Sequence, residues 1–231
     1  VLLGGRAMAT GVSAIFGEPA RVWDVDDGSG IFQLGSPVFF VSVMEASPCG
    51  TLVVTGGIDG VFLWSAATGA MRWLLPQSHL DVYQVGLAGG GAPVLLSDVR
   101  TMHAADSRDG RIRWRADLDG EPLRFAWLPG GDRIITFTDS RAVVWDAARG
   151  QQVLSLEGVD GLFYWGTVRI AASSSFVAAC GRRPANLAGR TWTAVWDAST
   201  GRRVHLAAAP RTGARGGSCS IAMGSSDGWT M

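Results

Sequence analysis

The sequence predicts an all-β protein built from repeats, and three recurring markers predict it. The first is a strand that ends in Trp-Asp and enters a turn closed by glycine, as in VWDVDDG at Val22–Gly28 and VWDASTG at Val195–Gly201. The second is a tryptophan on the following strand, at Trp73 and Trp114. The third is a turn rich in Gly, Ser or Pro before each copy, such as Ser47–Gly50. Three coincident markers indicate one repeated supersecondary unit.

The copies are spaced at the length of a propeller blade. The key positions Trp23, Trp64, Ala105 and Trp145 stand 41, 41 and 40 residues apart, and Trp196 follows after 51. A period of about 40–45 residues with four short strands is typical of a β-propeller. We predict a β-propeller of four-stranded antiparallel blades, about five of them present. The predicted blades are residues 1–35, 36–78, 79–119, 120–158 and 159–209, and residues 210–231 are the start of a further blade or a closing strand.

The second copy shows its strands most clearly. Val61 and Leu63 face one way and Phe62 and Trp64 the other, which is the period of a pleated strand. Asp59-Gly60 between two apolar runs predicts a hairpin turn, because glycine accepts positive φ and aspartate bonds its own backbone. The strands expected in this copy are Val38–Glu45, Thr51–Gly56, Val61–Ser65 and Met71–Leu75.

The other copies follow the same plan in order. The first has strands at Val1–Leu3, Arg6–Gly11, Arg21–Asp24 and Ile31–Leu34, with an enlarged connection at Val12–Ala20; the third is Val82–Leu118, the fourth Leu123–Leu156, and the fifth runs from Leu162 to about Ala208 with an insertion at Gly181–Arg190. Ser220–Met223 then resembles another inner strand. Two alternatives follow: Ser220–Met223 closes a ring by filling the gap in the first blade, or the chain is a fragment of a larger ring, which we favour.

Composition narrows the classes of function. The 47% hydrophobic content and the mean hydropathy of +0.19 fit strands buried on both faces. No apolar run approaches the ~18 residues of a membrane span, so we expect no membrane insertion. The net charge is zero, with 20 basic and 20 acidic residues, which disfavours nucleic acid. Cys49, Cys180 and Cys219 form neither a disulfide framework nor a metal pattern, which favours a reducing, cytoplasmic location.

The stretch Val41–Gly69, VSVMEASPCGTLVVTGGIDGVFLWSAATG, resembles a WD repeat. The resemblance extends over nearly the whole chain and implies a propeller, but it does not specify a function, since propellers host unrelated activities. The third copy, with ADSRDGRIRW at Ala105–Trp114, is similar instead to the Asp-x-x-x-Gly-x-x-x-Trp pattern of quinoprotein-type propeller blades.

The resemblance implies structural roles for one set of residues. In WD repeats the indole of the third strand donates to a Ser or Thr of the second strand, which is linked to a His before the inner strand and an Asp in the turn. The residues that fit are Thr55, Asp59 and Trp64 in the second copy, Thr136, Asp139 and Trp145 in the fourth, and Trp23 and Trp196 at the tryptophan position of the first and fifth. The expected His is missing from both the second and the fourth copy, so we predict a weaker polar network.

The sequence contains no catalytic constellation. His79, His103 and His205 lie in different copies without Cys or carboxylates at ligand spacing. Gly89–Gly91 lacks the Lys-Ser/Thr ending of a phosphate loop. We expect no enzyme activity, no metal and no cofactor.

We predict a non-catalytic scaffold that binds protein or peptide partners on one propeller face. Connections between second and third strands emerge on the same face, and loops on a rigid scaffold are where function concentrates. The candidate contact residues are Phe16, Glu18, Arg100, Arg141, Arg182, Arg183, Arg190 and Trp192, since Arg and Trp are enriched in hot spots. A solvated loop at 182–190 stays open as the simpler interpretation. Two alternative functions also stay open: a quinoprotein-like propeller with a small-molecule or enzymatic role, and the sensor or scaffold part of a larger multidomain protein.

Overall fold

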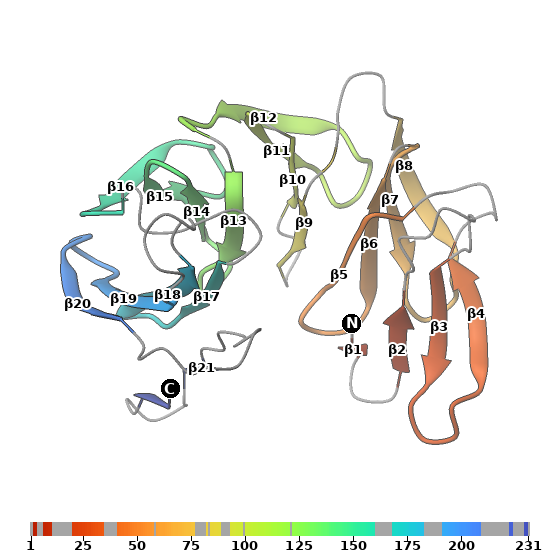
Figure 1. Cartoon of the computed structure of the whole chain (residues 1–231). Helices are drawn as coiled ribbons and strands as arrows, with labels where there is room; N and C mark the ends of the chain where they lie inside the picture. Colours follow the sequence, from red (N-terminus) through yellow and green to blue (C-terminus); the bar gives the residue numbers. More distant parts are fainter. Residues whose placement is uncertain are drawn as a thin grey trace. The chain divides into compact units, whose positions relative to one another are not determined.

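The structure is a computed structural model whose described residues form β-strands and turns (Figure 1). The described residues are 2–3, 7–10, 20–34, 41–57, 59–76, 82, 84–88, 93–98, 100–120, 122–159, 168–182, 191–208, 222–223 and 229–230. In this part of the chain, no helix has the length and hydropathy of a membrane span.

The strands form five four-stranded sheets and one short pair, and every pairing is antiparallel. Sheet 1 contains β1 (Leu2–Leu3), β2 (Ala7–Thr10), β3 (Ala20–Asp24) and β4 (Gly30–Leu34); sheet 2 contains β5 (Val43–Ala46), β6 (Leu52–Gly57), β7 (Gly60–Ser65) and β8 (Met71–Pro76). Sheet 3 contains β9 (Gln84–Leu87), β10 (Val94–Ser97), β11 (Thr101–Ala105) and β12 (Ile112–Asp117); sheet 4 contains β13 (Pro122–Trp127), β14 (Arg133–Thr138), β15 (Ala142–Asp146) and β16 (Gln152–Leu156). Sheet 5 contains β17 (Arg169–Ala172), β18 (Phe176–Arg182), β19 (Thr191–Asp197) and β20 (Arg203–Ala208), and β21 (Ala222–Met223) pairs with β22 (Trp229–Thr230). The predicted fold class, all-β with four-stranded antiparallel blades, is confirmed.

The chain divides into two compact units. Unit 1 is Val1–Asp117 with the turn Ala148–Gly150, and unit 2 is Leu118–Ala147 with Gln151–Met231. Sheets 1 to 3 therefore belong to unit 1, and sheets 4 and 5 to unit 2 apart from that turn.

Each unit has an apolar core formed between neighbouring sheets. In unit 1 one cluster joins sheets 1 and 2 and a second joins sheets 2 and 3, while in unit 2 one cluster joins sheets 4 and 5. The middle strands are buried along most of their length, as in β10, where all of Val94–Ser97 is buried. This burial on both faces explains why these strands are apolar throughout rather than alternating.

A β-bulge marks the key position of every sheet. The register between the third and fourth strands shifts directly before Trp23, Trp64, Ala105, Trp145 and Trp196. Ala105 is thus the structural equivalent of the tryptophans, as the spacing predicts. Trp73 and Trp114 are also equivalent, because they pair with Leu63 and Ala104, the residues just before the bulge.

The turn after the third strand ends in a glycine with a left-handed backbone. The glycines are Gly28, Gly69, Gly110, Gly150 and Gly201, with φ between +67° and +75°. In four of these turns the glycine N–H donates to the carbonyl four residues earlier: the pairs are Gly28 to Asp24, Gly69 to Ser65, Gly110 to Asp106 and Gly201 to Asp197. A side chain would strain this conformation, so glycine is required there.

Each of these glycines after the first lies against an outer strand. A Cβ built on the glycine would contact a side chain of the fourth strand of the preceding sheet: Gly69 would contact Phe32 at 2.7 Å, Gly110 Trp73 at 3.0 Å, Gly150 (part of unit 1) Trp114 at 2.5 Å, and Gly201 Leu154 at 3.2 Å. The quinoprotein-like Gly-x-x-x-Trp spacing of sheet 3 therefore reflects a packing contact that repeats along the chain. We call it the glycine-docking contact.

Some strand boundaries differ from the prediction. In sheet 2 the inner strand β5 begins at Val43 rather than Val38 and ends at Ala46 rather than Glu45. In sheet 5 the inner strand is β17 at Arg169–Ala172, and the start expected at Leu162 lies outside the described residues. The insertion expected at Gly181–Arg190 is shorter, because β18 stays paired with β19 as far as Arg182 opposite Thr191. Backbone pairing thus extends through Gly181 and Arg182, two residues past the apolar run that ends at Cys180.

The cysteines also differ from the prediction. Cys180 is fully buried in β18 and is disulfide-bonded, whereas Cys49 is an exposed free thiol. The sequence predicts no disulfide framework, yet Cys180 is bonded in a disulfide, which weakens the argument for a reducing compartment. Hydrogen bonds with Ser47 and Thr51 lower the pKa of the Cys49 thiol to about 7.

Candidate interaction face

The candidate sites are the turns between the second and third strands of the sheets, described here within each unit separately. Of the predicted contact residues, Arg100 lies in the β10–β11 turn of unit 1 and Arg141 in the β14–β15 turn of unit 2. Arg182 is described as the last residue of β18, by its backbone alone. The remaining predicted residues of the two long connections, Phe16, Glu18, Arg183 and Arg190, lie outside the described residues.

The β14–β15 turn is held by Asp119, which precedes sheet 4. The hydroxyls of Thr138 and Ser140 each donate to the Asp119 carbonyl at 2.9 Å. Arg141 donates from Nη1 to the Asp119 carboxylate at 2.5 Å and from Nη2 to Gln152 at 2.8 Å. Its side chain remains about one-third exposed, at 33%. The turn is therefore fixed on both sides while Ser140 is exposed and the Arg141 side chain keeps part of its surface in solvent.

Gly120 brings the Asp119 segment close to this turn. Its φ is +105°, and a Cβ built on it would lie 2.3 Å from Asp139 Oδ1 and 2.7 Å from Ser140 Oγ. The left-handed backbone strains any other residue there, and a side chain would also force Asp139 and Ser140 to move. Asp139, the predicted turn aspartate, thus lies against Gly120, just before sheet 4.

The β10–β11 turn carries a second polar cluster, formed by Asp98, Thr101 and His103. One carboxylate oxygen of Asp98 accepts the amides of Arg100 at 2.9 Å and Thr101 at 2.6 Å, and the other accepts the Thr101 hydroxyl at 2.5 Å. That hydroxyl lies 2.8 Å from His103 Nε2. Because the hydroxyl proton goes to Asp98, the imidazole Nε2–H must donate to Thr101. The Arg100 side chain is exposed beside the cluster.

Burial and polar contacts shift the pKa values of His103 and Asp98 in opposite directions. Burial lowers the pKa of His103, which is 6% exposed, while the nearby Asp98 carboxylate raises it, and the net pKa is below the usual value. Burial raises the pKa of Asp98, but hydrogen bonds from Thr101 and from the Arg100 amide lower it more, so its net pKa is below the usual value. The cluster therefore contains an ionised carboxylate and a neutral imidazole near neutral pH.

The tryptophans of the third strands donate hydrogen bonds inside the sheets. Trp64 Nε1 donates to Thr55 Oγ1 at 2.9 Å, and Trp145 Nε1 donates to Thr136 Oγ1 at 2.8 Å. Trp23 occupies the same position of sheet 1 and lies beneath the Arg21 guanidinium, whose Cζ is 5.8 Å from the ring centroid. These indoles make their contacts inside the sheets rather than in the turns between the second and third strands.

Sequence reasoning missed the acceptor in sheet 5. Trp196 Nε1 donates instead to the Glu157 carbonyl at 2.8 Å, because Ala179 stands where sheets 2 and 4 have threonine. The sequence does indicate this difference, because Ala179 has no hydroxyl that could accept the indole hydrogen bond. Asp59 lies in the β6–β7 turn of sheet 2, between strands that pair as far as Gly57 and Gly60.

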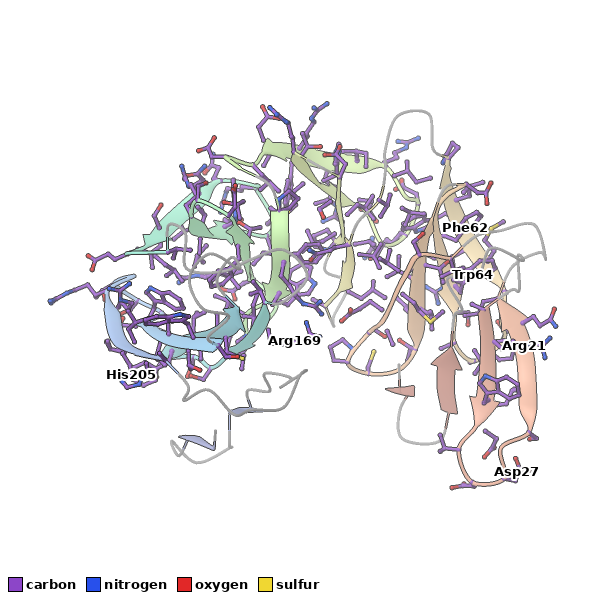
Figure 2. The ribbon with its side chains drawn as sticks, in the orientation of Figure 1. Arg21, Asp27, Phe62, Trp64, Arg169 and His205 are labelled. Atoms are coloured by element: carbon purple, nitrogen blue, oxygen red, sulfur yellow. The ribbon has the colours of Figure 1, made fainter. Side chains whose placement is uncertain are left out.

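Trp192, the last predicted contact residue, lies in β19 and packs against the core of unit 2. Figure 2 places two of the labelled residues far out on their sheets: His205 on β20 and Asp27 at the tip of the β3–β4 turn. In the part of the chain that the structure describes, no group of three His, Cys, Asp or Glu side chains is placed to hold a metal ion.

Comparisons with known proteins support the fold. The chain is similar to the crystal structure of the computationally designed Ika8 protein, with a TM-score of 0.71 and 19% identity over 89% of this chain. It spans 60% of the length of that protein. In all, 1060 solved chains match, which indicates a widespread architecture and gives no particular function. No protein-family model matches the sequence, and no curated protein does.

Proposed function

We propose that this chain is a non-catalytic interaction module of the WD-repeat type that binds a protein or peptide partner at the second-to-third turns of its sheets. The observation that supports the proposal is the rigid anchoring of these turns: three side chains of the β14–β15 turn are bonded to Asp119, and the β10–β11 turn is bonded to Asp98. A surface that is ordered before binding loses less entropy when a partner docks.

The exposed groups on these turns favour a partner segment with acidic side chains. Arg100 is exposed, and Arg141 keeps part of its guanidinium accessible although it is bonded to Asp119. Guanidinium groups bind carboxylates in two-pronged fashion and are frequent in hot spots. The hydroxyl of Ser140 adds a neutral donor and acceptor beside Arg141.

The polar cluster of the β10–β11 turn supports a binding role over a catalytic one. The imidazole of His103 is buried, and its Nε2 is bonded to Thr101. A general base must reach the proton of a substrate, so a histidine held inside the sheet contributes to the shape of the turn instead.

The proposal is tested by selecting peptides from a random library on the purified chain and measuring their affinity by fluorescence anisotropy. Arg100→Ala and Arg141→Ala should weaken the selected peptides about ten-fold, as loss of a hot-spot guanidinium does. Arg111→Ala is the matched control, because Arg111 is 88% exposed on the turn at the other end of sheet 3. Thermal unfolding of each variant separates lost binding from lost folding. Peptides that lose affinity only with Arg111→Ala, or a library that yields no binder, would contradict the proposal.

A further inference from the structure

His103 is a titratable group buried beside a turn that the proposed function uses. It lies in β11, an interior strand of sheet 3, and is 6% exposed. Its cross-strand neighbour on β10 is Leu96, which belongs to the apolar cluster between sheets 2 and 3. Cross-strand neighbours share one face of a sheet, so the imidazole lies on the face that carries this cluster. Burial of this kind disfavours a charged imidazolium.

A chain of three hydrogen bonds joins His103 to the backbone of Arg100. The imidazole Nε2 is 2.8 Å from Thr101 Oγ1 and 3.5 Å from Asp98 Oδ2. The Thr101 hydroxyl donates to the Asp98 carboxylate, and the other oxygen of that carboxylate accepts the amides of Arg100 and Thr101. The position of Arg100 therefore depends on a carboxylate that lies within reach of the imidazole.

The charged groups that act on His103 come from both neighbouring strands. Burial has the largest effect on the pKa of His103 and lowers it. Asp98 at the end of β10 raises this pKa, while on β12 Arg115 lowers it and Asp117 raises it. The residues that sheet 2 contributes to the cluster on this face are apolar. The net pKa lies below the usual value, so the surroundings of His103 favour the neutral ring.

Acid therefore acts against the ordered turn. The neutral ring donates its Nε2–H to Thr101 and leaves the Thr101 hydroxyl proton for Asp98. A second proton creates a buried cation that is attracted to Asp98, the acceptor on which the turn amides depend. A histidine whose pKa is lowered stabilises the ordered state above about pH 6.5, and this stabilisation is lost as the pH falls through the lowered value.

We propose that His103 makes the β10–β11 turn sensitive to pH, so that protonation of the ring in mild acid releases the Arg100 and Thr101 amides from Asp98 and the partner leaves Arg100. This inference rests on the proposed function, because it concerns the regulation of the same turn. The β14–β15 turn contains no histidine. A partner that is bound there through Arg141 should not respond to pH in this range.

Nuclear magnetic resonance of the full chain tests the turn itself, between about pH 7.5 and about pH 5, on both sides of the usual pKa of histidine. The amide signals of Arg100 and Thr101 should shift along the titration curve of the His103 ring. They should stay constant in His103→Gln, which keeps a side-chain donor and does not titrate. His205→Gln is the matched control, because it removes an exposed histidine from β20 and should leave these shifts as they are.

Two results of this titration would overturn the inference, whether or not a peptide binds. One is a pair of amide signals that does not follow the His103 ring, and the other is an equal shift in His103→Gln. Circular dichroism follows the sheets over the same range, and their loss would overturn a local opening of the turn.

Fluorescence anisotropy tests the partner, with selected peptides that lose affinity on Arg100→Ala. Acidic side chains of the peptide stay mostly ionised over this range, because their usual pKa is about 4. Affinity for the unmodified chain should fall about five-fold or more in acid, while affinity for His103→Gln should stay nearly constant. An equal loss with His103→Gln would overturn the inference and leave the proposed function standing. A library without a binder contradicts the proposed function, and the amide signals alone then decide whether the turn opens.

Discussion

Replacing Gly110 by alanine should destabilise unit 1 more than the same replacement at Gly28. The two glycines have nearly the same backbone, with φ +75° and +72°. A left-handed alanine costs about 1–2 kcal/mol in either turn. At Gly110 the new Cβ would also lie 3.0 Å from Trp73 Cδ2 and 3.1 Å from Cε3, whereas at Gly28 it meets nothing described within 4 Å. Overpacking of this kind adds about 1–3 kcal/mol.

The indole of Trp73 has little freedom to move aside. It is 7% exposed, and its Nε1 donates to the Ser107 carbonyl at 3.2 Å. We therefore expect Gly110→Ala to lower the free energy of unfolding by about 2–5 kcal/mol, against about 1–2 kcal/mol for Gly28→Ala.

Urea unfolding at low protein concentration, followed by tryptophan fluorescence and circular dichroism, measures both values. A third variant, Trp73→Leu with Gly110→Ala, removes the ring, and in the Trp73→Leu background the alanine should cost only about 1–2 kcal/mol. Equal losses for Gly28→Ala and Gly110→Ala, or no difference between the two backgrounds, would refute the packing argument.

Three further predictions concern separate parts of the chain. Thr136→Val leaves the buried indole N–H of Trp145 without its acceptor, so unfolding by urea should show a loss of about 1–3 kcal/mol, and no loss would mean that the N–H finds another partner. Because the pKa of buried His103 is lowered, the unfolded chain takes up the proton first as the pH falls below about 6.5, and stability falls with it; the melting temperature should drop less for His103→Gln over this range, and parallel curves would exclude the histidine as the cause. Since Cys180 is disulfide-bonded, a thiol assay in denaturant without reductant should find one free thiol per chain, and three would show that the disulfide is absent.

The repeat predicts the fold because its markers have local causes. A left-handed glycine turn and a short apolar strand that ends at the key position each depend on a few neighbouring residues. Ala105 could therefore be assigned to the tryptophan position although it has lost the indole, and the bulge before it agrees.

The contacts that the sequence could not predict join residues far apart in the chain. Asp119 holds the β14–β15 turn across about twenty residues, in a place where the WD pattern leads one to expect histidine. Trp196 uses a carbonyl 39 residues earlier, because Ala179 removes the usual hydroxyl. In both cases a backbone carbonyl replaces a side chain, and backbone acceptors carry no signature in the sequence.

The residue at the docking position of each outer strand follows from the contact that it makes. In repeat architectures each unit packs on its neighbours, so a residue inside the series is selected to fit the next turn. Phe32, Trp73, Trp114 and Leu154 are all apolar and all lie against a glycine. His205 holds the same register position in β20 with an exposed imidazole, so the apolar character of this position accompanies the glycine contact.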